Sequence, residues 1–243
     1  MTKQAHIQLE KIDHLTKAII VGDPKRVAII ASCLENVENL SSNRGYISIK
    51  GDYKGTPILV ISSGIGAPST AIVVEELINI GINTIIRVGS CGAMQHHIPL
   101  GELIIPTGVV RDEGLTKKYV PSDFPAIANE TLLSLAQQFA PNANFGITRS
   151  HDGFYMEDNA KNEAFWSHFG ILGADMESSA LYVLASLKNI RALSILNNVV
   201  LYEEDLNEGV NNLVNEEEMV ALGELQSIKL ALKILHEVDN KHV

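Results

Sequence analysis

The stretch AIIVGDPKRVAIIASCL, residues 18–34, decides the fold class. Its first four residues form an apolar run rich in Val and Ile, which is typical of a strand buried on both faces. The turn Gly22-Asp23-Pro24 follows at once, and Asp23 is suited to cap a helix in which Pro24 is the first residue. A buried strand that leads directly into a helix is the basic unit of an α/β protein.

The same alternation of short apolar runs and helix-like stretches recurs along the chain. Further buried strands are expected at residues 58–62, 84–88, 103–105 and 192–196. Helices are expected at residues 68–80, 129–139, 176–187 and 216–238. Residues 111–128 and 202–215 are irregular and predict surface loops. No internal repeat or linker interrupts the pattern, so we expect one domain over residues 1–243, with three α/β/α layers around a central mixed sheet.

Composition argues against several classes of protein. The chain carries 19 Lys and Arg against 29 Asp and Glu, a formal net charge of −10, which disfavours binding to nucleic acid or to an anionic membrane. Cys33 and Cys91 have neither disulfide nor metal-ligand spacing, so we expect no bound metal. No apolar run has the length of a signal peptide or of a membrane span, which predicts a cytoplasmic protein. Any bound anion must be held by a local basic cluster.

One arginine interrupts an apolar run. Arg87 lies inside an expected strand, where burial of its charge is costly unless the charge is paired, and paired buried charges tend to lie at functional sites. Gly89 would allow a ligand to approach the backbone closely, and Ser90 offers a hydroxyl at the strand end, where α/β sheets bind ligands. The structural alternative is that Arg87 pairs with a core carboxylate such as Glu75 or Glu76.

The turn after the first strand is a second candidate site. The N-terminus of a helix presents free backbone N–H groups, and Arg26, one turn into the expected helix, could donate two N–H bonds to a phosphate. The alternative is a plain capped turn with a solvated arginine. Residues 64–69, Gly-Ile-Gly-Ala-Pro-Ser, imitate a dinucleotide fingerprint, but they lack its third glycine and the ribose-binding acid after the next strand. We therefore do not expect NAD binding.

A pair of carboxylates marks a third candidate site. Asp175 and Glu177 flank Met176 where an apolar helix is expected to begin, so at least one carboxylate is directed toward the core. A buried carboxylate without a lysine partner can accept two neighbouring hydroxyls, such as the vicinal hydroxyls of a ribose. The alternative is that both acids merely favour the helix N-terminus by charge–dipole attraction, worth about 0.3–1 kcal/mol. Ser150-His151-Asp152 contains the residue types of a catalytic triad, but adjacent side chains point apart and form no relay.

Taken together, these motifs resemble the nucleoside phosphorylase-I family and, within it, the uridine phosphorylase branch. The similarity runs in order from about His6 to Val200, which is most of the chain. The motifs that carry it are residues 22–26, 43–44, 64–70 with 75–77, 87–92, 153–155 and 175–178. The resemblance implies phosphorolysis of a (deoxy)ribonucleoside to free base and (deoxy)ribose 1-phosphate, with inorganic phosphate as co-substrate, no cofactor, and a role in nucleoside catabolism and salvage.

The resemblance also implies the roles of individual residues. The residues expected to bind phosphate are Gly22, Arg26, Arg44, Arg87, Gly89 and Ser90, of which the three arginines would form a basic pocket. The residues expected to bind ribose are His6, Met176 and Glu177. Arg87 and Glu177 are the expected catalytic residues. Because Arg44 and His6 would serve the neighbouring subunit's site, we expect a homo-oligomer built from dimers, as in the family's hexamers.

The identity of the base is left open by the sequence. The residues expected around the base are Cys91, Gly92, Phe154, Asn197, Val199 and Val200, with Asn198 as another possible polar partner. Val199 and Val200 stand where purine-cleaving relatives carry an aspartate, which favours a uridine-like substrate. Residues 156–160, however, lack the glutamine and arginine with which the uridine branch reads uracil. Gly45, where that branch has a glutamate, weakens the expectation of its monovalent-cation site. The alternatives are a purine nucleoside phosphorylase, a hydrolytic nucleosidase and a silent nucleoside-binding paralogue.

Overall fold

A large mixed sheet organises the computed structural model, which describes residues 3–204 and 218–239. Ten strands are present in this part of the chain, in the order β10-β6-β8-β9-β5-β1-β4-β3-β2, with β7 beside β6. The strands are β1 (Lys17–Val21), β2 (Glu35–Asn43), β3 (Tyr46–Tyr53), β4 (Thr56–Ser62), β5 (Thr84–Ala93), β6 (Leu103–Asp112), β7 (Ala126–Ile127), β8 (Asn144–His151), β9 (Gly173–Asp175) and β10 (Arg191–Val200). The helices are α1 (Pro24–Ala31), α2 (Ala67–Asn79), α3 (Thr116–Tyr119), α4 (Glu130–Phe139), α5 (Asn159–His168), α6 (Ser178–Lys188) and α8 (Glu218–Glu237).

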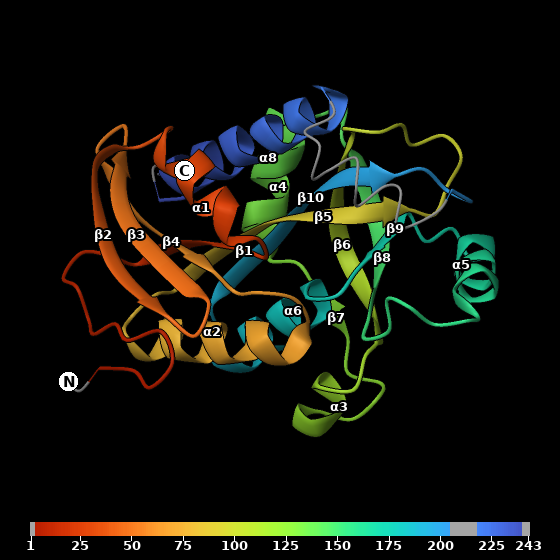
Figure 1. Cartoon of the computed structure of the whole chain (residues 1–243), viewed down its shortest axis with the longest axis horizontal. Coiled ribbons are helices and arrows are strands. Elements are labelled where there is room, and N and C mark those ends of the chain that lie inside the picture. The colour runs from red at the N-terminus through yellow and green to blue at the C-terminus, as the bar shows by residue number, and fades with distance from the viewer. Residues whose placement is uncertain (1–2, 205–217, 240–243) are drawn as a thin grey trace.

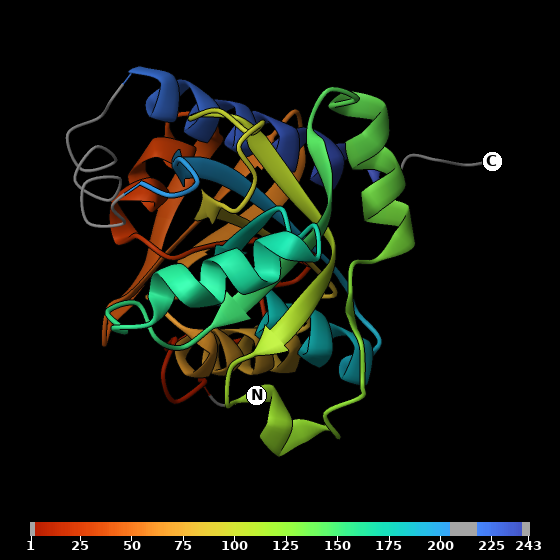
Figure 2. The ribbon, with the colours of Figure 1, turned by 90° about the vertical axis from the view of Figure 1, so that its right-hand side faces the viewer.

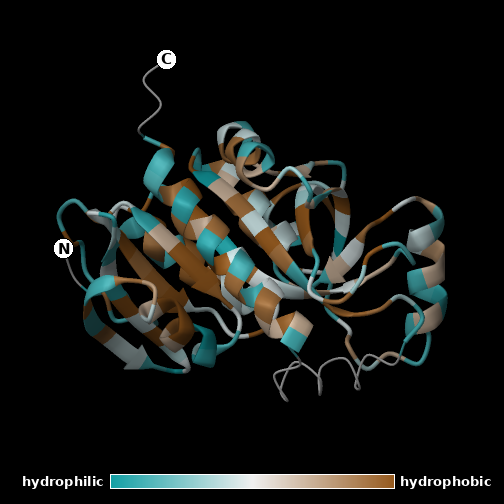
Figure 3. Cartoon of the chain, turned by 90° about the horizontal axis from the view of Figure 1, so that it is seen from above, coloured by the Kyte–Doolittle hydropathy of each residue, from teal (hydrophilic) through white to brown (hydrophobic). Residues whose placement is uncertain are grey.

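Helices cover both faces of the sheet (Figure 1). Successive side chains of a strand point to opposite faces. Thus Ile20 and Ile85 pack with residues of α2 and α6, whereas Ile19 and Ile86 pack with residues of α1, α4 and α8. Apolar residues are concentrated along the strands, while polar residues occupy the outer positions of the helices (Figure 3). The three α/β/α layers around a mixed sheet, predicted from the sequence, are confirmed.

The strand β5 is the centre of the architecture. It pairs in parallel with β1 on one side and with β10 on the other, and its last residues pair antiparallel with β9. Because β9 continues to β8, β8 to β6, and β6 back to β10, these five strands close into a ring. Helix α5 lies on the outside of this ring and faces the viewer in Figure 2. Ring closure brings the end of β5 next to β9 and the start of α6.

Several predicted elements are found with shifts of a few residues at their ends. Other elements of the structure were not predicted from the sequence. The expected helix at residues 24–34 ends at Ala31, and the expected strand at residues 103–105 extends to Asp112. Residues 111–128, expected to be a loop, contain α3 and β7. The strand β2 was missed because its sequence, ENVENLSSN, is polar and largely exposed at the sheet edge. Of the second predicted loop, residues 205–215 lie outside the described residues.

Hydropathy gives one further finding. No helix in residues 3–204 and 218–239 combines the length and the apolar character that are needed to cross a membrane.

Candidate active site

The first candidate residue, Arg26, is held in the core and not in solvent. Asp23 caps α1 by accepting a hydrogen bond from the Lys25 backbone N–H at 2.8 Å, as predicted. The Arg26 side chain is only 5% exposed. Its Nη1 donates to the Val88 carbonyl at 3.3 Å, its Nη2 donates to Ser90 Oγ at 3.1 Å, and its Nε donates to a carboxylate oxygen of Glu224 on α8. The alternative of a solvated arginine is therefore wrong.

The second arginine, Arg87, lies on the opposite face of β5, since it is two residues beyond Ile85. Its side chain is 3% exposed and binds two carboxylates. Nε donates to Asp175 Oδ2 at 3.2 Å, and Nη2 donates to Glu177 Oε2 at 2.5 Å. Its Nη1 is buried and has no hydrogen-bond partner among the described residues. Arg87 thus keeps one donor for which residues 3–204 and 218–239 supply no acceptor.

The structural alternative for Arg87 named the wrong carboxylates. Glu75 pairs with Lys188 at 2.9 Å, and Glu76 binds His6. Both glutamates lie on α2, whereas the partners of Arg87 lie at β9 and the start of α6. The sequence correctly indicated that the buried charge would be paired, but not with which residues.

The role expected for Gly89 needs a correction. A Cβ atom at residue 89 would lie 2.6 Å from Arg87 Cζ and 2.6 Å from its Nη2, which is far inside van der Waals contact. The guanidinium therefore folds forward along its own strand and covers Gly89. The space that this glycine provides is filled by Arg87, and not by an approaching ligand as the sequence suggested.

The residues Asp175 and Glu177 are both buried, at 5% exposure each. Asp175 accepts hydrogen bonds from two hydroxyls, Ser150 Oγ at 2.5 Å and Ser178 Oγ at 2.6 Å. It also accepts a hydrogen bond from the Ser178 backbone N–H at 3.1 Å. Asp175 therefore stabilises the start of α6, in agreement with the alternative that the acids favour the helix N-terminus. Glu177 accepts from the Gly66 backbone N–H at 2.6 Å. The two hydroxyls on Asp175 belong to serines of this chain, which leaves Glu177 as the candidate sugar-binding carboxylate.

Burial and charge act against each other at this cluster. Burial raises the pKa of the Glu177 carboxyl above its ordinary value, the nearby Arg87 charge lowers it, and Asp175 raises it further. Burial would lower the pKa of Arg87, but the charges of Glu177 and Asp175 outweigh burial and raise it. Arg87 therefore keeps its positive charge. The pKa of Glu177 is thus raised in spite of its ion pair with Arg87.

The cluster contains carboxylates as well as the arginines that were expected to form a basic pocket. Arg26 and Arg87 together contact three carboxylates, those of Glu224, Asp175 and Glu177. Two guanidinium groups against three carboxylates give no excess of positive charge when all are ionised. The single chain therefore has no excess of positive charge at this cluster, because each arginine already has a carboxylate partner within the fold. The expected basic pocket also includes Arg44 of a neighbouring subunit, so it stays a prediction.

Two of the expected ribose and phosphate residues, His6 and Arg44, lie together in another part of the molecule. His6 Nδ1 contacts Glu76 Oε1 at 2.6 Å, and Asn43 Nδ2 donates to the His6 carbonyl at 2.7 Å. Arg44 follows Asn43 in the exposed turn between β2 and β3, with a φ of 51°. Glu76 lies ten residues beyond Gly66 on α2, about 15 Å further along the helix. His6 is thus far along α2 from Gly66, which contacts Glu177.

The other expected phosphate and ribose residues lie close to the cluster. Gly22 directly follows β1 and precedes the Asp23 cap, and a Cβ atom at residue 22 would lie 3.4 Å from the Gly64 carbonyl oxygen. Met176 is half-buried between Asp175 and Glu177, and its backbone N–H donates to Glu177 Oε2 at 3.3 Å. The turn after β1, the loop before α2 and the start of α6 therefore meet around β5.

The residues expected around the base are only partly brought together. Gly92 and Val200 are partners on β5 and β10, and Val199 and Val200 pack against Val220. The Cys91 thiol is buried, which raises its pKa, and it lies 3.7 Å from the Asn197 carbonyl oxygen. Phe154 comes from the loop after β8, where its ring packs edge-on against Tyr155 at a centroid distance of 4.9 Å. The residues of β5 and β10 form one group, to which Phe154 makes no described contact.

The two asparagines of β10 are engaged in the fold. Asn198 Nδ2 donates to the Ile98 and Pro99 carbonyls, and its Oδ1 accepts from the Ala93 N–H at 2.9 Å. Asn197 Nδ2 donates to the Val220 carbonyl of α8 at 2.8 Å, and its buried Oδ1 has no partner among the described residues. The Asn198 amide therefore fixes the turn at residues 98–99, and only Asn197 retains a free acceptor.

Three residues of the site were not found from the sequence. Gly66 and Glu224 contact the cluster from positions 111 and 198 residues away from their partners, and no local pattern marks such a contact. Ser150 was noticed only as part of a false triad, although its hydroxyl binds Asp175. A polar residue at an inward position of a strand was the signal that could have identified Ser150.

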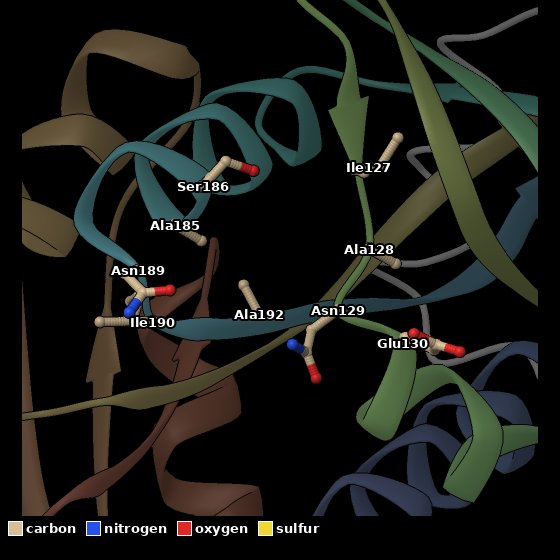
Figure 4. A pocket seen from close by; sticks show the side chains of 9 residues that line it. All are labelled: Ile127, Ala128, Asn129, Glu130, Ala185, Ser186, Asn189, Ile190 and Ala192. Carbon is tan, nitrogen blue, oxygen red and sulfur yellow. The ribbon is translucent and has the colours of Figure 1, made fainter.

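Two surface hollows lie elsewhere on the molecule. One of about 280 Å³ is lined by Asn129 at the start of α4 and by Ser186 and Asn189 at the end of α6 (Figure 4). The other, of about 420 Å³, lies between Phe139 and the start of α8 at Met219. In the described part of the chain, no three His, Cys, Asp or Glu side chains are grouped to hold a metal ion. The buried charge cluster around Arg87 is therefore the candidate active site on chemical grounds.

Comparisons with known proteins identify the family of the chain. The model of the phosphorylase superfamily matches residues 16–223. A guanosine phosphorylase of Halorubrum lacusprofundi is 36% identical over 199 residues, 80% of this chain and 82% of that protein. A uridine phosphorylase of Thermococcus kodakarensis is 38% identical over 205 residues, 78% of this chain and 74% of that protein. The crystal structure of uridine phosphorylase from Vibrio fischeri ES114 superimposes with a TM-score of 0.90 at 45% identity, covering 98% of each chain. The chain therefore belongs to the phosphorylase superfamily.

Proposed function

We propose that this protein is a nucleoside phosphorylase that cleaves a uridine-like (deoxy)ribonucleoside with inorganic phosphate. The products are the free base and (deoxy)ribose 1-phosphate. The observation that carries the proposal is the buried Arg87, which binds Asp175 and Glu177 and whose Nη1 has no partner in the part of the chain that the structure describes. A buried charged donor without a partner is costly, and a phosphate oxygen is a suitable acceptor for it. The similarity to uridine phosphorylases supports the same reaction.

The proposed reaction is a displacement at the sugar carbon C1′. The bond from C1′ to the base nitrogen lengthens, its electron pair leaves with the base, and the ribose acquires oxocarbenium character. A phosphate oxygen then forms the new bond to C1′, and the proton that the hydrogen phosphate gives up ends on the departing base nitrogen, through solvent, to yield the free base. Arg87 on one face of β5, and Ser90 with Arg26 on the other, reach the phosphate beyond the carboxyl end of this strand. Glu177 binds the sugar hydroxyls. Catalysis in this scheme comes from positioning and fixed charge, and it requires no covalent enzyme intermediate.

The proposed assembly is a dimer, further associated into a hexamer, in the cytoplasm. His6 and Arg44 support the dimer because they lie together, and His6 is far along α2 from the residue that contacts Glu177. In a dimer they can enter the partner's site. Arg44 would then add the positive charge that the single chain lacks, since Arg26 and Arg87 are already outnumbered by carboxylates. Each active site would be shared between two chains.

If each active site is shared between two chains, then two inactive variants should regain activity when they form a mixed dimer. Arg44→Ala and Glu177→Ala should each lose phosphorolysis when assembled alone. In a mixed dimer, the chain carrying Arg44→Ala keeps its own Glu177 and receives the partner's intact Arg44. We therefore expect activity to return when the two variants are unfolded, mixed and refolded together. Each variant refolded alone is the control, and a mixture as inactive as its components would contradict the shared site.

The decisive experiment measures release of free base with and without inorganic phosphate. Uridine, thymidine, inosine, adenosine, guanosine and methylthioadenosine would be incubated with the protein and separated by chromatography. Phosphate-dependent release of uracil or thymine is the expected result. Phosphate-dependent release of purines alone would move the proposal to a purine nucleoside phosphorylase, as the similarity to a guanosine phosphorylase would allow. Release without phosphate would indicate a nucleosidase, and binding without release would indicate a silent paralogue.

A further inference from the structure

The ion pair between Arg26 and Glu224 joins the first helix of the chain to the last. The Arg26 Nε donates to a Glu224 carboxylate oxygen, and the two side chains are only 5% and 16% exposed. The other two nitrogens of this guanidinium donate to the Val88 carbonyl and to Ser90 Oγ. The guanidinium thus has two sides: its Nε faces α8, and its two Nη groups face the end of β5.

The position of Glu224 is fixed by the residues beside it. A Cβ atom on the preceding residue, Gly223, would overlap the Gly101 carbonyl oxygen and Asn197 Oδ1, so α8 and the turn at residue 101 are in backbone contact. One turn later, the buried Ser227 donates its hydroxyl to the Glu224 carbonyl at 2.7 Å. The Glu224 side chain therefore projects from a rigid part of α8, and its carboxylate is a fixed anchor for Arg26.

This anchor has two opposite effects on a phosphate held at Arg26 and Ser90. It keeps the flexible arginine in one orientation, which lowers the entropy lost when an anion binds. It also places the negative charge of Glu224 beside the guanidinium that must attract the anion. The carboxylate and the phosphate have like charges, which repel each other in a partly buried site. A carboxylate and a neutral amide in this position differ only in the second effect, because both accept a hydrogen bond from Nε.

We propose that Glu224 is a positioning residue for phosphate: it directs both Nη groups of Arg26 toward β5, and its charge keeps the affinity for phosphate moderate. This inference rests on the proposed function, because it concerns the co-substrate of that reaction. The purpose of a moderate affinity is turnover, since the same guanidinium must release the phosphate ester of the sugar product.

Two substitutions separate orientation from charge. Glu224→Gln keeps an acceptor for Arg26 Nε and removes the negative charge, so we expect KM and Kd for phosphate to fall about tenfold. Glu224→Ala removes the acceptor as well and frees the guanidinium, so we expect KM for phosphate to rise about tenfold. The KM for nucleoside at saturating phosphate should stay within about twofold of the wild-type value in both variants, because Glu224 does not touch the sugar-binding carboxylate.

The measurements are initial rates over a range of phosphate concentrations and calorimetric titration of the full-length protein with inorganic phosphate. Glu218→Gln is the matched control, because Glu218 is an exposed glutamate in the first turn of the same helix. Thermal unfolding would identify a variant that loses activity through misfolding. Changes in the same direction for Glu224→Gln and Glu224→Ala, or unchanged phosphate constants in both, would overturn the positioning role.

The titration also separates this inference from the proposed function. If the wild-type protein neither binds phosphate nor needs it for base release, then the proposed function fails. If the wild-type protein is a phosphate-dependent enzyme and the variants match it, then only the role of Glu224 fails.

Discussion

Arg87→Ala is expected to lower the free energy of unfolding by about 3–5 kcal/mol at neutral pH, the usual cost of removing one partner of a buried ion pair. Arg87 is 3% exposed and binds both Asp175 and Glu177, which are also buried. Without the guanidinium, two carboxylates remain in the core without their cation. Phosphorolysis should be lost at the same time, since the donor proposed to bind phosphate is removed.

The pH dependence of this loss tests its cause. Burial already raises the pKa of Glu177, and removal of Arg87 takes away the charge that opposes the shift. A carboxyl whose pKa is higher in the folded than in the unfolded state favours folding when it is protonated. The deficit of Arg87→Ala should therefore be largest at neutral pH and shrink as the pH falls through the raised pKa. Denaturant unfolding of both proteins across this pH range measures the difference.

Arg191→Ala is the matched control for this experiment. Arg191 pairs with Asp239 at 2.9 Å, but the two side chains are 29% and 50% exposed. Pairs of this kind contribute about 0–1 kcal/mol because water screens them. An Arg87→Ala variant as stable and as active as Arg191→Ala would remove Arg87 from the site and from the core network.

Gly89→Ala is expected to reduce phosphorolysis by at least about a hundredfold, the effect that a misplacement of about 1 Å can have on a catalytic group. The new Cβ atom would lie 2.6 Å from Arg87 Cζ, and the guanidinium cannot move aside without stretching its bonds to Asp175 and Glu177. Overpacking in a core costs about 1–3 kcal/mol. Activity should therefore fall much more than stability does.

Gly108→Ala provides the comparison for Gly89→Ala. Gly108 is also a strand glycine, but a Cβ atom there would meet only the Ala126 carbonyl oxygen, at an ordinary distance of 3.5 Å. Steady-state kinetics and thermal unfolding of both variants would separate the effect on Arg87 from the effect of any added methyl group. Near-normal kcat/KM in Gly89→Ala would show that the position of the guanidinium over residue 89 is unimportant for the reaction.

Local sequence patterns predicted the central part of the fold and the identity of its unusual charge. The run at residues 18–21 and the Asp23 cap are local signals, and β1 and α1 follow from them. Arg87 was recognisable because a charge inside an apolar strand requires a partner. The edge strand β2 gave no such signal, since Glu35, Glu38 and their neighbours are polar and exposed. Strand formation there depends on pairing with β3, a contact that propensity does not describe.

The partners in the candidate site could not be predicted because they depend on tertiary structure. Asp175 and Glu177 are 88 and 90 residues from Arg87, and Glu224 is 198 residues from Arg26. The sequence indicated residue types that require counter-charges, and the resemblance assigned them to phosphate and ribose. Only the fold shows that carboxylates already neutralise both arginines, and this result changes the expected electrostatics of the site.

Because β5 lies between two arginines, insertions and deletions of single residues within this strand would disrupt the site. Arg87 and Ser90 face opposite sides of one strand, and β5 pairs with β1, β10 and β9. An insertion of one residue just before Arg87 would turn its side chain toward α1 and α8, away from both of its carboxylates. Insertions and deletions in the surface turns leave this alternation intact. Turns that carry no residue of the site can therefore change in length, whereas a single-residue gap within β5 would separate Arg87 from its carboxylates.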